Sequence, residues 1–411
     1  MKRTMPLVGF AAMLLLFGAG YSPAAASSGS GKAEGFIYGT VETEGGHRYT
    51  GIIRWGDEEA FWDDLFNSDK TKLPYIDRQP EDQRKRRDVH VLGFHIGYDW
   101  DEGCCRQFVA RFGDIAEIRP EGGEKVDVRM KTGTTYHLDD GSNDIGAELQ
   151  IEDPELGAVN IEWKRIERIT FAAAPGSARP EDTRLYGEVA TEDGVFRGFV
   201  QWDSQECLGT DKLDGYSEDG KLSLAMGRIR SIEKKGRSSS GVEMRDGRKF
   251  ELHGTNDVDS SIRGIFVEDE RYGRVKVSWD AFRRVDFNEG SATGRGYADY
   301  KPAKELHAKV TDKDGKTWKG RIIFDLDESE SWEMLDGKHR GVEYSIPFEM
   351  VRSIERVDDD SSAVTLKTGR DLKLEETQDV TERNAGVLVL QEGSASEHYV
   401  AWDRVDKIEF D

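Results

Sequence analysis

The sequence has little cysteine, little proline and too few basic residues to balance its acids. It carries 3 Cys and 10 Pro among 411 residues, and 58 Lys and Arg stand against 80 Asp and Glu, for a formal net charge of −22. The acidic excess argues against nucleic acid as a partner, because phosphate binding needs clustered Lys and Arg. It also argues against docking on an anionic membrane surface.

The sequence also lacks the short motifs of common enzymes. It contains no G-x-S-x-G, H-E-x-x-H, P-loop or dinucleotide-binding pattern. Its 8 His are scattered without a common register. We therefore predict no catalytic residues, no cofactor and no metal site.

An export signal is predicted at the N-terminus. Lys2 and Arg3 precede the apolar run Pro6–Gly20, and the stretch Ala24–Ala26 offers an Ala-x-Ala cleavage site. The apolar run is shorter than the ~20 residues of a spanning helix, and nothing downstream reaches that length. We expect residues 1–26 to be removed, the mature protein to be periplasmic or extracellular, and no transmembrane segment to remain after cleavage.

An exported protein can form disulfides, because its compartment is oxidising. The three cysteines are Cys104, Cys105 and Cys207, and their odd number leaves at least one unpaired or paired between chains. A bridge between Cys105 and Cys207 would join the first and second repeats described next. The alternative is that these residues are small buried thiols.

Three stretches of the chain align with one another. In each, a glycine precedes an aromatic residue by four positions, and a glutamate follows the aromatic residue by four. The three sets are Gly51, Trp55 and Glu59; Gly198, Trp202 and Glu206; and Gly320, Phe324 and Glu328. Self-similarity at this spacing predicts tandem repeats. We place them at residues 36–171, 184–287 and 304–411.

Each repeat divides further into two halves. The second halves close on Trp163, Trp279 and Trp402, each followed by apolar residues at +3, +6 and +8. The sequence therefore predicts six related modules. Gly51 and Ile115 are 64 positions apart, against 31 for the corresponding residues of the other two repeats. The first repeat thus carries an insertion, predicted at about residues 63–98.

The modules are predicted to consist of β-strands. Apolar and polar residues alternate over short spans such as 126–130 and 274–279, as in half-buried strands. Asp-Gly, Gly-Gly and Thr-Gly pairs between these spans are typical of hairpin turns. We predict an all-β fold of three tandem repeats, each made of two small modules that are β-barrel-like or β-sheet in form.

The modules resemble the Sm-like and bacterial SH3-like small β-barrels. Gly51–Asp57 and Gly198–Asp203 follow the Sm pattern of Gly, apolar strand, aromatic and Asp, and the strands 157–163 and 273–279 resemble the second Sm motif. The Asn and Arg-Gly positions with which that family contacts RNA are not matched, which again excludes RNA as a ligand. The alternative architecture is a six-bladed β-propeller, since a blade also takes ~40–50 residues.

The repeated aromatic and acidic residues are the candidate binding residues. Trp55 and Trp202 could stack on sugar rings if exposed, although their fixed register favours a role in the core. Asp144, Asp257 and Asp379 recur in the second halves, as Glu59, Glu206 and Glu328 do in the first halves. Six similar acidic sites do not make one active site. A turn or cap hydrogen bond is the favoured role of these aspartates, with weak divalent-cation binding as the alternative.

The insertion offers two further features. Arg84–Arg87 is a basic run in an acidic protein, which is typical of a solvated loop or of a contact with acidic groups. Residues 95–105 contain imidazole, carboxylate and thiol groups, an inventory that could hold a metal ion but follows no known spacing.

These observations favour an exported, non-catalytic envelope protein that acts as a binding or scaffolding module through its repeated β-units. An envelope protein or a glycan is the expected kind of partner, and the oligomeric state stays open. The competing hypothesis is a carbohydrate-active or other envelope hydrolase with an acidic cleft in the first repeat, the repeat that departs from the other two.

Overall fold

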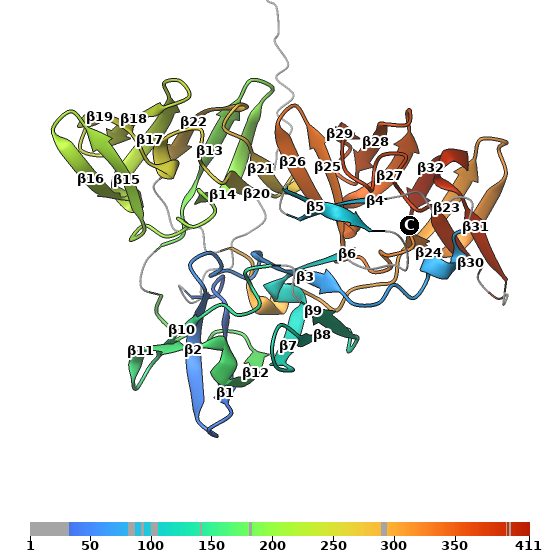
Figure 1. The fold of residues 1–411 in the computed structure, drawn as a ribbon, viewed down its shortest axis with the longest axis horizontal. Helices are drawn as coiled ribbons and strands as arrows, with labels where there is room; N and C mark the ends of the chain where they lie inside the picture. Colours follow the sequence, from blue (N-terminus) through green and yellow to red (C-terminus); the bar gives the residue numbers. More distant parts are fainter. Residues whose placement is uncertain are drawn as a thin grey trace, which may run out of the picture. The chain divides into compact units, whose positions relative to one another are not determined.

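The computed structural model describes residues 33–80, 87–91, 94–99, 106–139, 142–180, 183–288, 294–391, 393 and 396–411. These residues form β-strands joined by turns and short 3-10 helices, with no helix of seven residues or more (Figure 1). The prediction of an all-β fold is confirmed. Within this part of the chain, no helix has the length and apolar character that crossing a bilayer requires. The predicted export signal lies outside the described residues.

The first segment (residues 36–171) contributes strands β1 to β12. Their bounds are β1 Tyr38–Thr43, β2 Arg48–Trp55, β3 Leu65–Lys70, β4 Arg87–Val91, β5 Phe94–Asp99, β6 Arg106–Arg111, β7 Ile115–Pro120, β8 Val126–Met130, β9 Thr135–Asp139, β10 Leu149–Asp153, β11 Gly157–Ile161 and β12 Ile166–Phe171.

The second segment (residues 184–287) and the third segment (residues 304–411) contribute ten strands each. The second has β13 Tyr186–Thr191, β14 Val195–Trp202, β15 Lys212–Ser217, β16 Gly220–Ala225, β17 Ile229–Lys234, β18 Ser239–Met244, β19 Lys249–His253, β20 Ile265–Asp269, β21 Gly273–Val277 and β22 Phe282–Phe287. The third has β23 His307–Asp312, β24 Thr317–Phe324, β25 Met334–His339, β26 Val342–Pro347, β27 Val351–Arg356, β28 Ser361–Leu366, β29 Asp371–Glu375, β30 Val387–Gln391, β31 Glu397–Val400 and β32 Val405–Phe410.

Short 3-10 helices precede several of the strands. They are η1 Ile76–Arg78, η3 Phe112–Asp114, η4 Trp163–Arg165, η5 Met226–Arg228, η6 Asn256–Val258, η7 Tyr297–Asp299, η8 Phe348–Met350 and η9 Trp402–Arg404. Two of them, η4 and η9, begin at the closing tryptophans Trp163 and Trp402 and end directly before the last strand of their segment.

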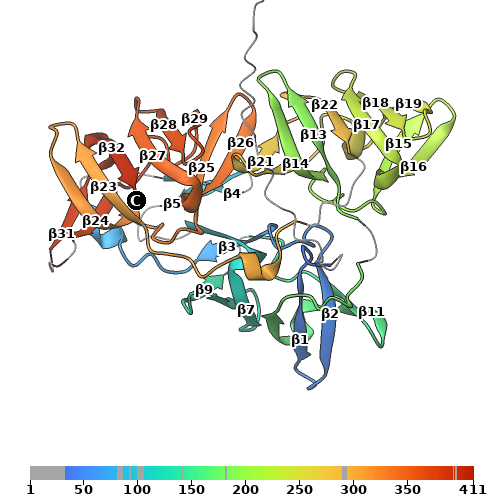
Figure 2. The same cartoon turned by 180° about the vertical axis from the view of Figure 1, so that it is seen from behind.

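The three segments share one order of antiparallel pairing. In the first segment the order is β11-β10-β2-β1-β12-β7-β8-β9-β3-β6. Counterpart strands follow the same order in the second segment, from β21 through β20, β14, β13, β22, β17, β18, β19 and β15 to β16. The third segment repeats it from β31 to β26. Figure 2 shows the strands of each segment from the opposite side.

The two halves of each segment interleave, which differs from the expectation of separate modules. The hairpin β1–β2 belongs to the first half, yet β1 pairs with β12 and β2 pairs with β10 of the second half. In return, β8 and β9 of the second half pair with β7 and β3 of the first. A hairpin has two edges that need partners, and here the other half supplies them. The sheets stay open, so the expected small barrels are not closed.

The insertion of the first segment lies between β3 and β6. The counterpart strands β15 and β16, and likewise β25 and β26, are joined by turns of two residues. In the first segment the same connection runs from residue 71 to residue 105 and contains the separate hairpin β4–β5. The sequence placed the insertion at about 63–98, a range that includes β3 itself.

The recurring glycines lie where two strands come unusually close. A Cβ atom on Gly51, Gly198 or Gly320 would lie 2.0, 1.8 or 2.2 Å from a main-chain oxygen of the neighbouring strand. Those oxygens belong to Glu152, Glu268 and Leu390. Because backbone cannot move aside as a side chain can, only glycine fits. This contact is the physical reason for the glycine four residues before each aromatic residue.

Basic side chains of one segment form ion pairs with acidic side chains of another segment. Asp64, Asp211 and Glu333 each accept main-chain hydrogen bonds within their own loop through one carboxylate oxygen. The other oxygen of each faces a cation from a different segment, at 3.4 Å from Arg274, 3.0 Å from Arg54 and 3.0 Å from Lys70 respectively. The second and third segments are also joined directly, because β21 pairs with β26.

Candidate functional site

Trp55 and Trp202 are core residues in the structure. Both side chains are 0% exposed. The indole N–H of Trp55 donates to the main-chain oxygen of Asp144 at 2.9 Å, and that of Trp202 donates to the main-chain oxygen of Asp257 at 2.8 Å. Neither ring face is open to a sugar, which favours the core interpretation of these residues.

The three repeated aspartates hold strands in place. Each accepts a hydrogen bond through Oδ2 from the main-chain N–H of the third residue in a nearby strand. The donors are Asn67 of β3 to Asp144 at 2.6 Å, Asp214 of β15 to Asp257 at 2.6 Å, and Asp336 of β25 to Asp379 at 2.7 Å. The aspartates are buried. This geometry is the cap role that the sequence favoured for them.

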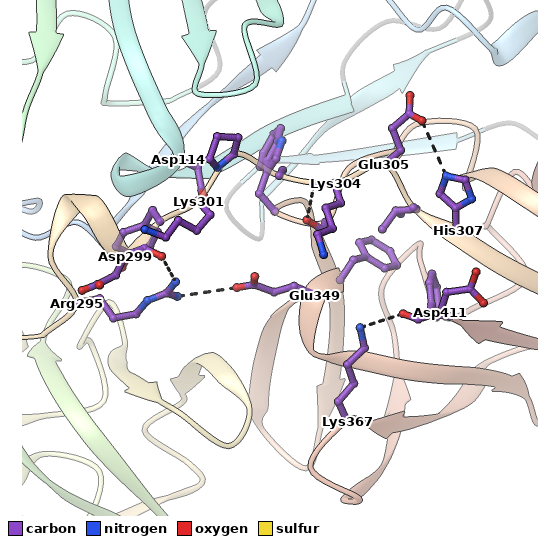
Figure 3. Close-up of a pocket in the computed structure, with 18 residues that line it drawn as sticks. Asp114, Arg295, Asp299, Lys301, Lys304, Glu305, His307, Glu349, Lys367 and Asp411 are labelled. Atoms are coloured by element: carbon purple, nitrogen blue, oxygen red, sulfur yellow. Dashed lines mark hydrogen bonds and ion pairs between the residues drawn. The ribbon is translucent and has the colours of Figure 1, made fainter. Parts of the chain in front are cut away.

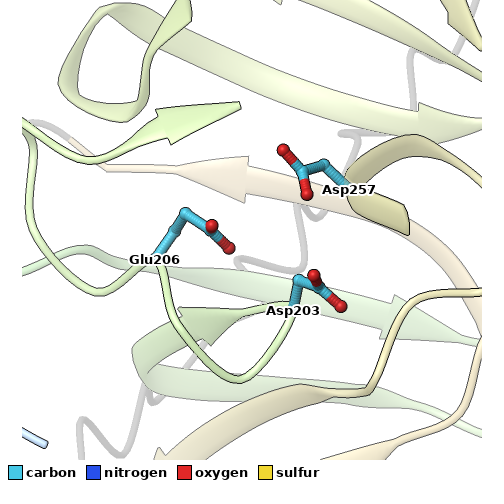
Figure 4. A group of neighbouring side chains, drawn as sticks. All are labelled: Asp203, Glu206 and Asp257. Atoms are coloured by element: carbon cyan, nitrogen blue, oxygen red, sulfur yellow. The ribbon is translucent and has the colours of Figure 1, made fainter. Parts of the chain in front are cut away.

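The second segment brings three carboxylates together. Asp203 and Glu206 follow β14, and Asp257 lies in η6, with oxygen atoms of all three within 4.8 Å of one another (Figure 4). Such a set could supply three oxygen ligands to a metal ion. One positive group already contacts the cluster, since the Arg263 guanidinium lies 2.8 Å from Asp203 Oδ2.

Burial and the neighbouring carboxylates favour the protonated forms of Glu206 and Asp257. Burial, together with the charges of Asp257 and Asp203, raises the pKa of Glu206 to about 8. Burial also raises the pKa of Asp257 to about 6, although the hydrogen bond from the Asp214 N–H opposes that shift. A proton on Glu206 therefore relieves the repulsion inside the cluster near neutral pH.

The corresponding acids of the first segment are Glu59 and Asp144. Burial raises the pKa of both groups, and for Glu59 the nearby Asp144 carboxylate adds to the effect. Their exposed fractions are only 8% and 1%, and neither lines the cavity described next. An acidic cleft open to a substrate, as the hydrolase hypothesis requires, is not formed by this pair.

A cavity of about 740 Å³ lies beside residues 295–307 (Figure 3). Its volume falls in the ~300–1,000 Å³ range of small-molecule sites. Asp114 of the first segment contributes to one part of its wall, and residues of the third segment contribute to another. The apolar lining includes Trp332, Phe348 and Phe410.

The segment at residues 296–300 is held against the first segment by several contacts. Lys131 Nζ donates to the main-chain oxygens of Tyr297 and Tyr300 at 2.6 and 2.9 Å. The Tyr297 hydroxyl donates to the main-chain oxygen of Ile115 at 2.9 Å. The Tyr300 ring packs directly on Gly113, where a Cβ atom would lie 2.4 Å from the ring. These contacts fix the wall of the cavity.

Most charged groups of the cavity already have partners within the protein. Arg295 lies 3.9 Å from Glu349 and donates to the main-chain oxygen of Asp299. Lys301 donates to the main-chain oxygen of Ala298, and Lys367 to that of Asp411. Four Lys or Arg and five Asp or Glu line the cavity, so its charges nearly balance.

Two lining residues hold buried oxygens that lack a hydrogen-bond partner. They are Oδ2 of Asp114, a residue that is 8% exposed, and Oη of Tyr300, which is 3% exposed. Burial raises the pKa of Asp114 to about 6, and the nearby Arg111 guanidinium opposes that shift. An unsatisfied buried polar atom costs about 1–3 kcal/mol, so a hydrogen-bonding group that reaches either oxygen is favoured. Both atoms are closed to solvent in this structure.

Sequence reasoning missed Asp114 and Tyr300. Neither belongs to the repeated pattern, because they do not recur at corresponding positions in all three segments. One local signal could have found Tyr300. A flexible linker carries small polar residues, but the glycine-rich stretch 288–296 is followed by two aromatic residues, Tyr297 and Tyr300.

Several predicted features fall outside the described residues. Cys105, Arg84–Arg86 and residues 100–105 belong to this group. Cys207 is buried and has no disulfide partner among the described residues, and burial raises the pKa of its thiol well above the usual range. The pairing of Cys105 with Cys207 stays a prediction, as do the proposed roles of the basic run and of residues 95–105.

Comparison with known proteins gives no match for this chain: no protein family, no curated protein and no solved structure is similar to it.

Proposed function

We propose that this protein is an exported, non-catalytic binding protein of the cell envelope, built from three tandem repeats. The shared order of nine strand pairings in the three segments supports the repeat architecture. The export signal at Lys2–Ala26 supports a periplasmic or extracellular location. The interleaved halves support a common ancestor for the six half-repeats, whose relation to Sm-like units rests on their sequence pattern alone.

The cavity beside residues 295–307 is the proposed binding site, and a neutral, hydroxyl-rich saccharide is the proposed ligand class. The observation that carries this proposal is the cavity itself, whose volume suits a small ligand and whose wall combines polar groups with the aromatic rings of Trp332, Phe348 and Phe410. Sugar hydroxyl groups donate and accept hydrogen bonds and carry no charge. The cavity suits them because its charged groups nearly balance in number and most of them have partners within the protein, which leaves little net charge for an ion to meet.

Isothermal titration calorimetry of the mature protein with glucose, N-acetylglucosamine and their soluble oligosaccharides tests this function. We expect binding by at least one sugar. Asp114→Asn is expected to weaken it about tenfold or more, since a lost hydrogen bond to a charged group is worth ~1.5–3 kcal/mol, and Tyr300→Phe about two- to tenfold, since a neutral hydrogen bond is worth ~0.5–1.5 kcal/mol. Glu305→Gln is the matched control, because Glu305 lines the cavity but pairs with Arg321 at 3.0 Å. No heat with any sugar, or unchanged binding by both variants, contradicts the proposal.

A further inference from the structure

Four strands of the two large sheets have a pairing partner on one side only among the described residues. They are β6 and β11, which end the ten-stranded sheet, and β16 and β31, which pair with β15 and β30 alone. An unpaired edge carries free N–H and C=O groups that can pair with another strand. The four edges differ in what lies beside them.

Two of these edges lie against other parts of the same chain. In β6, Arg106 pairs with Asp325 and Arg111 lies 3.3 Å from Glu349, both of the third segment. In β31, Glu397 lies 2.8 Å from Arg78, and Tyr75 packs on the apolar cluster that Tyr399 also joins. These contacts keep an incoming strand away from β6 and β31.

The other two edges, β11 and β16, are open. In β11 the residues Gly157, Ala158 and Asn160 are exposed, and in β16 Gly220 and Lys221 are exposed. The sequence of β11 is Gly-Ala-Val-Asn-Ile, which contains neither a charge nor a proline to block pairing.

The chain itself contains a joint between strands of these two kinds. Strand β21 is the counterpart of β11, because it pairs with β20 as β11 pairs with β10. Strand β26 is the counterpart of β16, because it pairs with β25 as β16 pairs with β15. In the structure β21 and β26 pair with each other, and Lys276 stands opposite Glu343.

We propose that β11 of one copy of this protein pairs with β16 of a second copy and so repeats, between chains, the joint that β21 and β26 make within the chain. Transfer of the register places Asn160 opposite Lys221 and Val159 opposite Leu222. Because β11 and β16 are different surfaces, the contact is heterologous. In a dimer, β11 of each copy pairs with β16 of the other copy. With more copies, the same contact forms a ring or an open chain. This inference is independent of the saccharide site.

Sedimentation equilibrium of the mature protein over a wide concentration range tests the assembly. We expect a mass above that of one chain, rising with concentration. Asn160→Lys places like charges opposite each other and weakens association, whereas Asn160→Glu places a carboxylate opposite Lys221 and strengthens it, with about a tenfold difference between the two variants. Lys221→Glu combined with Asn160→Lys restores association. Ser238→Lys is the matched control, because Ser238 is exposed and lies on neither edge.

Cysteine cross-linking tests the register. In a background with Cys104→Ser and Cys105→Ser, Asn160→Cys with Lys221→Cys is expected to give a disulfide-linked species of two or more chains on a non-reducing gel. Asn160→Cys with Ser238→Cys is expected to give none. A strictly monomeric protein at every concentration overturns the proposal, and so does an assembly whose stability and cross-linking ignore residues 160 and 221, since another surface or partner strand then mediates it.

Discussion

The ammonium group of Lys70 lies 3.0 Å from a carboxylate oxygen of Glu333, a residue 263 positions away in the sequence. It also lies 2.8 Å from Asp327, and the three side chains are at most 8% exposed. Burial acts to lower the pKa of Lys70, but the carboxylates of Asp327 and Glu333 outweigh burial and raise it. This buried group joins the first segment to the third.

Removal of the cation from this group is expected to be costly. Lys70→Ala leaves two carboxylates buried without their partner, and breaking a buried pair in this way costs about 3–5 kcal/mol. Urea unfolding followed by tryptophan fluorescence measures the change. Lys70→Arg keeps the charge and is expected to lose less, and Lys72→Ala, at an exposed position, is expected to change nothing. A Lys70→Ala protein as stable as the original contradicts the assignment.

The carboxylate cluster of the second segment predicts a pH-dependent stability. The pKa of Glu206 is about 8 in the folded protein, above its ordinary value of 4.5, so the folded state binds this proton more tightly than the unfolded chain does. The corresponding stability is fully present below about pH 4.5 and is lost as the pH rises through about 8. Glu206→Gln, which cannot ionise, is expected to flatten this loss.

Thermal unfolding at pH 5 and pH 9 checks this prediction. We expect Glu206→Gln to match the original protein at pH 5 and to exceed its Tm at pH 9 by at least about 2 °C, roughly the effect of 1 kcal/mol in a domain of this size. Glu218→Gln, at an exposed position in the same segment, is the control. Equal pH profiles for the original protein and Glu206→Gln refute the assignment of the shift to Glu206.

Trp202 provides a graded test of the core. Trp202→Ala removes a fully buried ring and is expected to cost about 3–5 kcal/mol. Trp202→Phe keeps most of the ring but leaves the main-chain oxygen of Asp257 without its donor, for an expected cost of about 1–3 kcal/mol. The third segment tolerates Phe324 at the corresponding place, so the Phe variant should fold. Differential scanning calorimetry gives the order of stability of these variants. Leu156→Ala, at a residue that is 66% exposed, is the control.

Gly113 tests the wall of the cavity. Gly113→Ala places a Cβ atom 2.4 Å from the Tyr300 ring, so the ring must move. Overpacking of this kind lowers the free energy of unfolding by about 1–3 kcal/mol. The displacement of Tyr300 is expected to abolish sugar binding as well. Gly176→Ala meets nothing within 4 Å and should be neutral in both measurements. Unfolding curves measure the stability of the two variants, and calorimetric titration measures their sugar binding. A Gly113→Ala protein that keeps both contradicts the prediction.

The sequence alone determined the strands and the relation among the segments. Alternating apolar residues, Gly-containing turns and the recurring spacing from Gly198 to Trp202 and Glu206 are local signals, and they predicted the all-β class and the buried indoles. The same register predicted that Asp144 and its counterparts serve as caps. These features depend on neighbours a few residues away, so a linear sequence contains them.

Only the tertiary structure decided which strands pair and where a cavity forms. In the interleaved halves β1 pairs with β12 and β2 pairs with β10. These pairings depend on which strand edges of one half are free to accept strands of the other half, and no local sequence pattern specifies that choice. Asp114 and Tyr300 line one cavity because Lys131 and Gly113 hold the chain at residues 296–300 in place. Contacts across nearly 200 residues arise from packing, and packing is a property of the assembled core rather than of any one segment.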